Sequence, residues 1–203
     1  MVKYDPNAWQ TLNKFDNNFS HRADDKPGVG WVPFRENIVN WVFEEKDTFD
    51  NFLDTGACLG HFIERLREMG VTNPYQGMDI TPNFVDRANE KLPNESFEVG
   101  DVRTMKYDDN SYDLVMCCGV LMHLPELSQP MSEVFRVAKK KVLISMFYSP
   151  NQTYENHFQN KFLSYYYSRE DIVKHFPADW KITRERNFNQ PMNLIQFLLE
   201  KKE

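Results

Sequence analysis

From residue 49 onward, short apolar runs alternate with stretches in which apolar side chains recur every three or four positions. Within residues 61–70, four apolar side chains fall on one helical face: Phe62, Ile63, Leu66 and Met69. Gly70 follows them as a stop signal. Strands are predicted over 49–56, 75–80, 96–101, 112–121, 140–149, 180–188 and 193–202. Helices are predicted over 34–45, 61–70, 81–92, 124–139 and 168–176.

This alternation predicts how the strands are joined. Strands that alternate with helices are connected by right-handed crossovers and form a largely parallel sheet. The last two predicted strands are separated only by residues 189–192, and such a short connection allows antiparallel pairing. The pattern therefore predicts an α/β fold with a doubly wound, mostly parallel seven-stranded sheet and a C-terminal antiparallel hairpin.

The first 45 residues differ in texture from the rest of the chain. They mix aromatic with polar side chains and contain a turn-rich stretch with Pro and Gly at 24–33. We expect residues 1–45 to form an N-terminal helical and loop cap over the sheet. Residues 46–203 are expected to form the sheet domain, with a polar-aromatic insert at about 148–167.

Three successive predicted strands are followed by a carboxylate: Asp54, Asp79 and Asp101. In a doubly wound sheet, ligands bind beyond the carboxyl ends of the strands. A dinucleotide loop needs the pattern G-x-G-x-x-G, because its glycines let a pyrophosphate approach the following helix. After Gly56, the equivalent positions hold Cys58 and His61. The sequence therefore disfavours a pyrophosphate ligand.

A ligand with a nucleoside but no phosphate suits the same residues. Asp79 is placed to accept hydrogen bonds from both ribose hydroxyls, and Asp101 from an adenine amino group. The backbone N–H of Val102 would reach a ring nitrogen. The turn at 56–60 would then face a charged amino-acid tail, and carboxylates tolerate a cationic sulfonium where they would repel a pyrophosphate. This chemistry favours S-adenosylmethionine.

Four segments, in this order and spacing, resemble the class I (Rossmann-like) S-adenosylmethionine-dependent methyltransferases: "FLDTGACLGHF", "YQGMDITPNFVDRANE", "FEVGDVRTM" and "SYDLVMCCGVLMHLPE". The likeness covers roughly residues 49–147 and implies a Rossmann-like methyltransferase domain within 46–203. Two departures stand out. Cys58 occupies a position where the family usually has Gly, and "AKKKV" at 138–142 replaces a Pro-Gly-Gly type of turn.

The resemblance also implies which residues bind the donor. It places the methionine moiety on the turn after the first strand and the ribose on the end of the second, with Ile80 against the adenine. The segment 117–123 would line the donor methyl group and the acceptor. The implied donor-binding residues are Asp54, Gly56, Ala57, Gly60, Asp79, Ile80, Asp101, Val102 and Cys118.

His123 lies closest to this predicted site among the histidines, and two interpretations of it stay open. It acts as a general base, with a pKa near neutral pH, or backbone groups hold it at the start of a helix. Many methyl transfers need no strong base, because alignment of the reacting atoms and exclusion of water supply much of the acceleration.

The insert and the N-terminal segment carry the same kind of alternative. Some residues of the insert either line the acceptor pocket, which the insert would then cover, or pack against the N-terminal segment. These residues are Tyr148, Asn151, Tyr154, His157 and Tyr165. The aromatic residues of the N-terminal segment are expected in the core of the cap: Trp9, Phe19, Trp31 and Trp41. In the alternative, Arg22 or Arg35 binds the donor carboxylate and Trp9 or Trp31 closes the site.

Composition and charge narrow the function classes. The 203 residues are 41% hydrophobic and 14% aromatic, which supports one packed domain. The net charge of −6 does not favour a polyanion, so nucleic acid is not expected as a partner. No apolar run reaches the length of a membrane span and the N-terminus lacks a signal-peptide stretch, so we expect a cytoplasmic protein without a membrane partner. The three cysteines form no C-x-x-C pair, and no metal is expected.

The expected function is an S-adenosylmethionine-dependent methyltransferase that acts on a small-molecule acceptor at oxygen or nitrogen. One alternative is a non-catalytic partner protein with the same fold, in which Cys58 weakens donor binding. A nicotinamide-dependent oxidoreductase is a third interpretation, and the interrupted glycine pattern disfavours it. The sequence does not specify the oligomeric state.

Overall fold

The computed structural model describes residue 10 and residues 32–158, 162–189 and 193–202. The helices are α2 (Val32–Glu45), α3 (His61–Glu68), α4 (Pro82–Lys91), the short 3-10 helix η2 (Leu121–His123), α5 (Ser128–Val137) and α6 (Arg169–Val173). The strands are β1 (Phe52–Asp54), β2 (Tyr75–Asp79), β3 (Ser96–Val99), β4 (Tyr112–Cys118), β5 (Ala138–Ser149), β6 (Tyr154–Phe158), β7 (Phe162–Ser168), β8 (Trp180–Phe188) and β9 (Leu194–Lys201).

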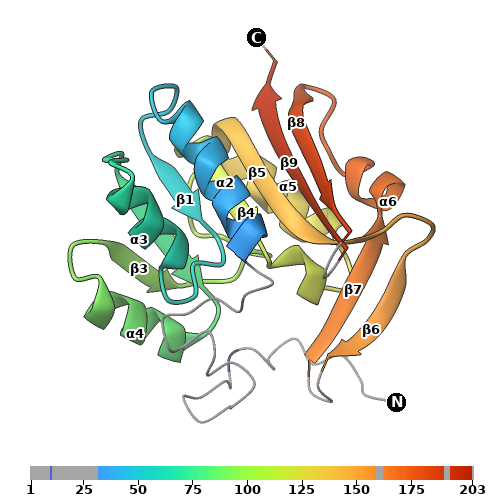
Figure 1. Ribbon diagram of the computed structural model, residues 1–203, viewed down its shortest axis with the longest axis horizontal. Coiled ribbons are helices and arrows are strands. Elements are labelled where there is room, and N and C mark those ends of the chain that lie inside the picture. Colours follow the sequence, from blue (N-terminus) through green and yellow to red (C-terminus); the bar gives the residue numbers. More distant parts are fainter. Residues whose placement is uncertain (1–9, 11–31, 159–161, 190–192, 203) are drawn as a thin grey trace.

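The strands form one sheet whose centre is parallel (Figure 1). Strands β3, β2, β1, β4 and β5 lie side by side in this order and all run parallel. Strand β9 pairs antiparallel with β5, and β8 pairs antiparallel with β9. The predicted α/β fold, with its mostly parallel sheet and C-terminal antiparallel hairpin, is confirmed.

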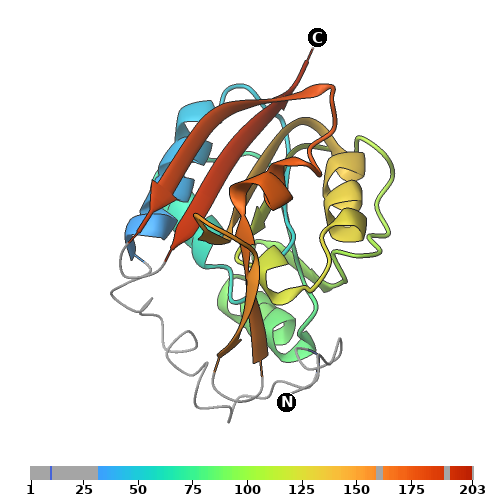
Figure 2. The same ribbon diagram turned by 90° about the vertical axis from the view of Figure 1, so that its right-hand side faces the viewer.

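The insert adds two strands to the seven that the sequence predicts. Strands β6 and β7 form an antiparallel hairpin, and β7 runs parallel to the last two residues of β5, with Tyr148 opposite Tyr167. The described sheet therefore has nine strands. Figure 2 shows the hairpin projecting below the rest of the sheet. It leaves the sheet at the edge where β5 ends.

Two buried clusters cover the two faces of the sheet. Helices α2, α3 and α4 contribute to one cluster, and α5 and α6 to the other, which also includes Phe34 at the start of α2 (Figures 1 and 2). Side chains of β4 alternate between them: Leu114, Met116 and Cys118 face one cluster, and Val115 and Cys117 face the other. This alternation is the period of two that a pleated strand imposes, and it explains why β4 is apolar throughout.

Helix α2 is the described part of the predicted N-terminal cap. Its side chains Ile38, Val39 and Val42 are buried in the same cluster as Phe52 of β1, and Trp41 packs against that cluster. Trp9, Phe19, Arg22 and Trp31 lie outside the described residues. Helix α2 thus packs directly onto the sheet, and a domain boundary at residue 45 remains a prediction.

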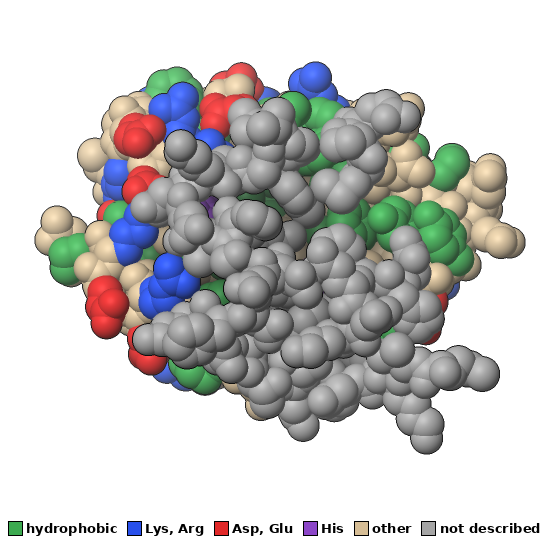
Figure 3. Space-filling model, turned by 60° about the horizontal axis from the view of Figure 1, so that its bottom comes forward, with side chains coloured by type: hydrophobic (Ala, Val, Ile, Leu, Met, Phe, Trp, Pro, Cys, Tyr) green, Lys and Arg blue, Asp and Glu red, His purple; other side chains and the backbone are tan. Residues whose placement is uncertain are grey.

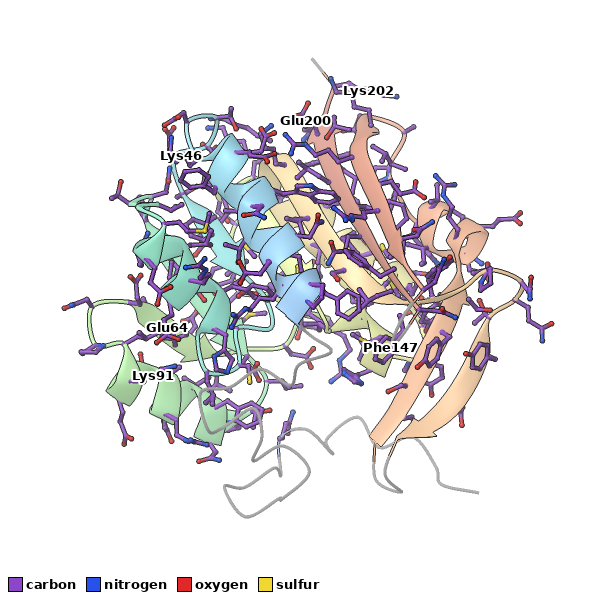
Figure 4. All side chains as sticks on the ribbon, viewed as in Figure 1. Lys46, Glu64, Lys91, Phe147, Glu200 and Lys202 are labelled. Atoms are coloured by element: carbon purple, nitrogen blue, oxygen red, sulfur yellow. The ribbon has the colours of Figure 1, made fainter. Side chains whose placement is uncertain are left out.

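The carboxyl ends of the parallel strands meet at one edge of the molecule. In Figure 4, Glu200, which lies opposite Lys141 near the start of β5, is labelled at the top, and Phe147, near the end of β5, is labelled below it. The same figure shows Glu64 of α3 and Lys91 of α4, whose side chains form an ion pair at 2.9 Å. The lower edge in Figure 1 is therefore where a ligand site is expected.

Candidate functional site

A cavity lies at this edge, beyond the ends of β1, β2 and β4. Its lining comes from the loop after β1, the end of β2, the start of α4, the loop after β3 and the segment after β4: Thr55, Gly56, Cys58, Asp79, Ile80, Phe84, Gly100, Asp101, Val102, Arg103, Gly119, Val120, His123 and Leu124. Figure 3 turns this edge toward the viewer, with hydrophobic side chains gathered at the right of this face, where the hairpin lies.

Asp54 lies at the end of β1 and is completely buried. One carboxylate oxygen accepts a long hydrogen bond of 3.4 Å from the backbone N–H of Gly56, and the other has no partner among the described residues. Burial raises the pKa of Asp54 from its ordinary 3.8 to about 7, opposed by the Gly56 hydrogen bond and supported by the charge of Asp79. Asp54 is thus a buried carboxyl group that is only partly ionised near neutral pH.

Asp79 is the last residue of β2, and its carboxylate both binds backbone N–H groups and lines the cavity. Its two carboxylate oxygens accept backbone hydrogen bonds of 2.9 Å from Cys58 and from Thr81. Burial raises its pKa, although these backbone N–H groups hold part of the rise back. The Thr81 side chain and the backbone N–H of Ile80 also bond to this carboxylate, which lines the cavity. It also connects the loop after β1 to the start of α4.

Asp101 follows β3 and is held by Arg103, two residues further along the chain. Arg103 donates from Nε to both carboxylate oxygens, at 2.9 and 3.0 Å, and from Nη2 to Oδ2 at 2.5 Å. Burial alone would raise the pKa of Asp101, but the hydrogen bonds from Arg103 outweigh it and the pKa falls below its ordinary value. Asp101 is therefore ionised and fixed at the rim of the cavity.

The loop after β1 contains two positions that depend on residue type. A Cβ on Gly56 would lie 2.2 Å from Cγ2 of Val120, so the close approach of these two cavity-lining residues requires glycine there. Cys58 has a positive φ of 49°, a left-handed conformation that costs a non-glycine residue about 1–2 kcal/mol. This conformation favours glycine, the residue that the family resemblance implies at the Cys58 position.

The segment after β4 begins at a left-handed glycine. Gly119 has a φ of 76° and donates its N–H to the carbonyl of Ser145. This conformation ends the strand before the predicted limit of 121 and starts η2. Cys117 and Cys118 stay inside the sheet, where burial raises the pKa of the Cys117 thiol to about 12 and that of Cys118 well above its ordinary value. Neither thiol is suited to nucleophilic chemistry.

His123 ends η2 and lines the cavity. Its Nδ1 atom lies 3.4 Å from the carbonyl oxygen of Leu163 on β7. The next residue, Leu124, also lines the cavity, and its carbonyl accepts a hydrogen bond from the Tyr167 hydroxyl. The hairpin therefore borders the candidate site at His123 and Leu124.

The predicted site residues divide into two groups. Six of them line the cavity: Gly56, Asp79, Ile80, Asp101, Val102 and His123. Four do not line it: Asp54, Ala57, Gly60 and Cys118. Ala57 and Gly60 shape the loop beneath it, since Gly60 takes the left-handed conformation that begins α3 and donates its N–H to Ala57. Cys118 instead faces the core cluster below α2 and α3.

The structure shows which of the candidate side chains in the insert are buried and which are exposed. Tyr148 and Tyr165 are buried in the core cluster on the α5 side, while Asn151 and Tyr154 are exposed. The side chain of His157 lies outside what the structure describes. Arg35 of α2 pairs with Glu36 at 3.3 Å, and its buried Nε has no partner among the described residues.

The residues of the cavity fit S-adenosylmethionine better than a dinucleotide. Two ionisable carboxylates, Asp79 and Asp101, face the cavity, and a third, Asp54, lies beneath it with one oxygen that has no partner among the described residues. Such a set suits ribose hydroxyls, an amino group and a cationic sulfonium, and repels a pyrophosphate. Within the described part of the chain, no His, Cys, Asp and Glu side chains gather as a metal site. No helix there is long and apolar enough to cross a membrane.

Comparison with known proteins agrees with this chemistry. Residues 53–146 match the model of a methyltransferase domain. The chain is 29% identical over 89 residues to demethylmenaquinone methyltransferase of Deinococcus radiodurans, covering 42% of this chain and 37% of that protein. It is 28% identical over 103 residues to phosphoethanolamine N-methyltransferase 2 of Caenorhabditis elegans, covering 47% of this chain and 23% of that protein. The chain therefore spans well under half the length of these relatives.

A solved structure extends the likeness to nearly the whole chain. Magnesium protoporphyrin IX methyltransferase of Synechocystis, with bound S-adenosylmethionine, superposes with a TM-score of 0.73 at 18% identity, over 93% of both chains. This superposition shows a shared fold. Residues 53–146 therefore match a methyltransferase domain, and the chain has the fold of the class I S-adenosylmethionine-dependent methyltransferases.

Proposed function

We propose that this chain transfers a methyl group from S-adenosylmethionine to an oxygen or nitrogen atom of a small molecule. One observation carries the proposal: Asp79, Asp101 and His123, which come from three different strand ends, line a single cavity. Two of these side chains suit the donor nucleoside, and the third suits removal of a proton from an acceptor. When bound, S-adenosylmethionine supplies an electrophilic methyl group on a cationic sulfur.

The chain's own residues divide the work of donor binding. Asp79 would accept the ribose hydroxyls, because its carboxylate lines the cavity at the end of β2 and backbone groups hold it in place. Asp101 would accept the adenine amino group while Arg103 holds it ionised. Ile80 and Val102 provide apolar contact for the ring. Arg35 lies at the start of α2, and its Nε has no partner among the described residues, so it is a candidate for the donor carboxylate.

His123 would take the acceptor proton. It is the one histidine among the residues that line the described cavity, and it is adjacent to the cavity-lining residue Leu124. A neutral imidazole removes a proton from a hydroxyl or amine as the new bond to carbon forms.

Two observations support a small-molecule acceptor. The relatives named above act, by name, on demethylmenaquinone and phosphoethanolamine. The chain is also acidic, with a net charge of −6, and such a charge slows association with nucleic acid. A nicotinamide cofactor is disfavoured, because Asp79 and Asp101 would meet its pyrophosphate region with like charge.

The proposal is tested with S-adenosylmethionine that carries a radiolabelled methyl group. The protein is incubated with the donor and, in separate tubes, with a small-molecule extract, total RNA and a protein fraction. Radiolabel is expected only in small organic products. The Asp79→Asn variant is expected to transfer much less label to them than the wild-type protein does. Label in RNA or protein would contradict the acceptor class, and no transfer in any tube would favour a non-catalytic partner protein.

A further inference from the structure

The 3-10 helix η2 is held from two sides. On one side it is joined to β4 through the turn at Gly119. Its second side is β7 of the hairpin: the Leu163 carbonyl lies 3.4 Å from Nδ1 of His123, and the Tyr167 hydroxyl donates to the Leu124 carbonyl. Both contacts reach η2 or the residue that follows it, and both His123 and Leu124 line the cavity.

The hairpin that makes these contacts is itself anchored. Leu163, Tyr165 and Tyr167 are buried in the same core cluster as Leu121 and Met122 of η2. On the opposite side of β7, the ring of Tyr166 stacks between those of Phe147 and Tyr154, with ring centroids 4.9 and 4.8 Å apart. Because both faces of β7 are packed, the Leu163 carbonyl has a fixed position beside His123.

The chemistry of this contact determines where the imidazole proton lies. A backbone carbonyl oxygen only accepts hydrogen bonds. For Nδ1 of His123 to be bonded to it, Nδ1 must carry the proton, and in the neutral ring the lone pair then belongs to Nε2. A free imidazole exchanges between both tautomers, so a fixed acceptor next to Nδ1 selects one of them.

We propose that the β6–β7 hairpin positions His123, with the Leu163 carbonyl holding it as the Nδ1–H tautomer and Tyr167 keeping η2 against that carbonyl. The inference rests on the proposed function, in which Nε2 of His123 receives the acceptor proton. As the acceptor oxygen or nitrogen bonds to the methyl carbon, its bond to hydrogen breaks and the proton moves to Nε2. The electron pair of the broken carbon–sulfur bond stays on sulfur, and the resulting imidazolium still donates from Nδ1 to Leu163.

The tautomer is measurable without any acceptor. The protein is labelled with ¹⁵N in its five histidines, and long-range proton–nitrogen correlation spectra are recorded at a pH where the rings are neutral. The His123 signals are assigned by their loss in His123→Gln. The wild-type protein is expected to show the Nδ1–H pattern for His123. An Nε2–H pattern in the wild-type protein would overturn the inference, whatever the variants show.

Two hairpin variants test the role of Tyr167. Tyr167→Phe removes the hydroxyl that holds Leu124, and is expected to shift His123 toward a mixture of tautomers. Tyr154→Phe, on the exposed edge of the same hairpin, is the matched control and is expected to keep the wild-type spectrum. An unchanged tautomer in folded Tyr167→Phe would overturn the role of Tyr167.

Calorimetric titration with S-adenosylhomocysteine separates this inference from the proposed function. Both variants are expected to bind it as the wild-type protein does, because neither residue lines the donor side of the cavity. If the wild-type protein failed to bind it while His123 showed the Nδ1–H tautomer, the proposed function would be overturned and the positioning of His123 would stand.

Discussion

The buried carboxyl group of Asp54 makes a quantitative prediction about stability and pH. Its pKa rises from 3.8 in the unfolded chain to about 7 in the fold, because burial disfavours the charged form. One pKa unit corresponds to about 1.4 kcal/mol, so an ionised Asp54 lowers the free energy of unfolding by roughly 4 kcal/mol. Asp54→Asn keeps the shape and removes the charge.

The sign of the effect follows from proton binding. Between pH 3.8 and pH 7 the folded protein holds the Asp54 proton more tightly than the unfolded chain does. The stability that this proton provides is complete below about pH 3.8 and is lost as the pH rises through 7. From pH 5 to pH 8, the wild-type protein should therefore lose roughly 2–3 kcal/mol relative to Asp54→Asn.

Urea denaturation of both proteins at pH 5, 6, 7 and 8 measures this difference. Subtracting one protein from the other cancels groups that titrate alike in both, so the remaining pH dependence reports Asp54. The advantage of Asp54→Asn should grow with pH and level off above about 7. Two stability curves that stay parallel over this range would refute the reasoning, because they would mean that Asp54 is already ionised at pH 5 in the folded protein.

Three further predictions concern the walls of the cavity. Gly56→Ala should lower the free energy of unfolding, measured by urea denaturation, by about 1–3 kcal/mol, because the added Cβ would lie 2.2 Å from Val120. The double variant Gly56→Ala, Val120→Ala should regain much of this stability, and a double variant as unstable as Gly56→Ala would contradict the steric explanation. Iodoacetamide should modify Cys58 before the two buried cysteines of β4, as read by mass spectrometry, and should weaken binding of S-adenosylhomocysteine; intact binding would show that the Cys58 side chain does not face the donor. In Arg103→Gln, Asp101 loses the cation that lowers its pKa. The loss of calorimetric affinity for S-adenosylhomocysteine between pH 7.5 and pH 5 should therefore be larger in this variant than in the wild-type protein, and an equal loss in both proteins would count against this role of Arg103.

The strand-end carboxylates illustrate what the sequence could predict. Apolar runs that end in Asp locate Asp54 and Asp79 at the ends of β1 and β2, and Asp101 just after β3. Parallel topology brings these ends to one edge. The same reasoning located His123 beside the cavity, because η2 follows the neighbouring strand β4. Local periodicity and the rules of strand connection were sufficient for these positions.

Other features depend on three-dimensional packing. Cys118 was expected at the donor, but strand alternation turns its side chain into the core, and the cavity lining resumes only at Gly119. The pairing of Arg103 with Asp101 depends on a tight turn after β3, although the spacing Asp-x-Arg hints at it. The hairpin was expected only as an insert, since aromatic strands such as 162–168 lack simple alternation of polar and apolar residues.

Two cavity-lining residues had no separate signal in the sequence. They belong to a loop or a helix start whose apolar side chains are equally compatible with an ordinary core, and only the fold brings them to the cavity: Phe84 and Leu124. The seven-stranded prediction was correct for the main sheet, and the two additional strands arise where β7 pairs with the last residues of β5.

The central claim is that this cavity binds the nucleoside of S-adenosylmethionine. Calorimetric titration with S-adenosylhomocysteine and with NAD tests it directly, with Asp79→Asn as the matched variant that keeps the side-chain shape. The account predicts saturable binding of S-adenosylhomocysteine, none of NAD, and a loss of about 1–3 kcal/mol in Asp79→Asn through weaker hydrogen bonds to the ribose. Binding of NAD, or no binding of S-adenosylhomocysteine by the wild-type protein, would contradict it.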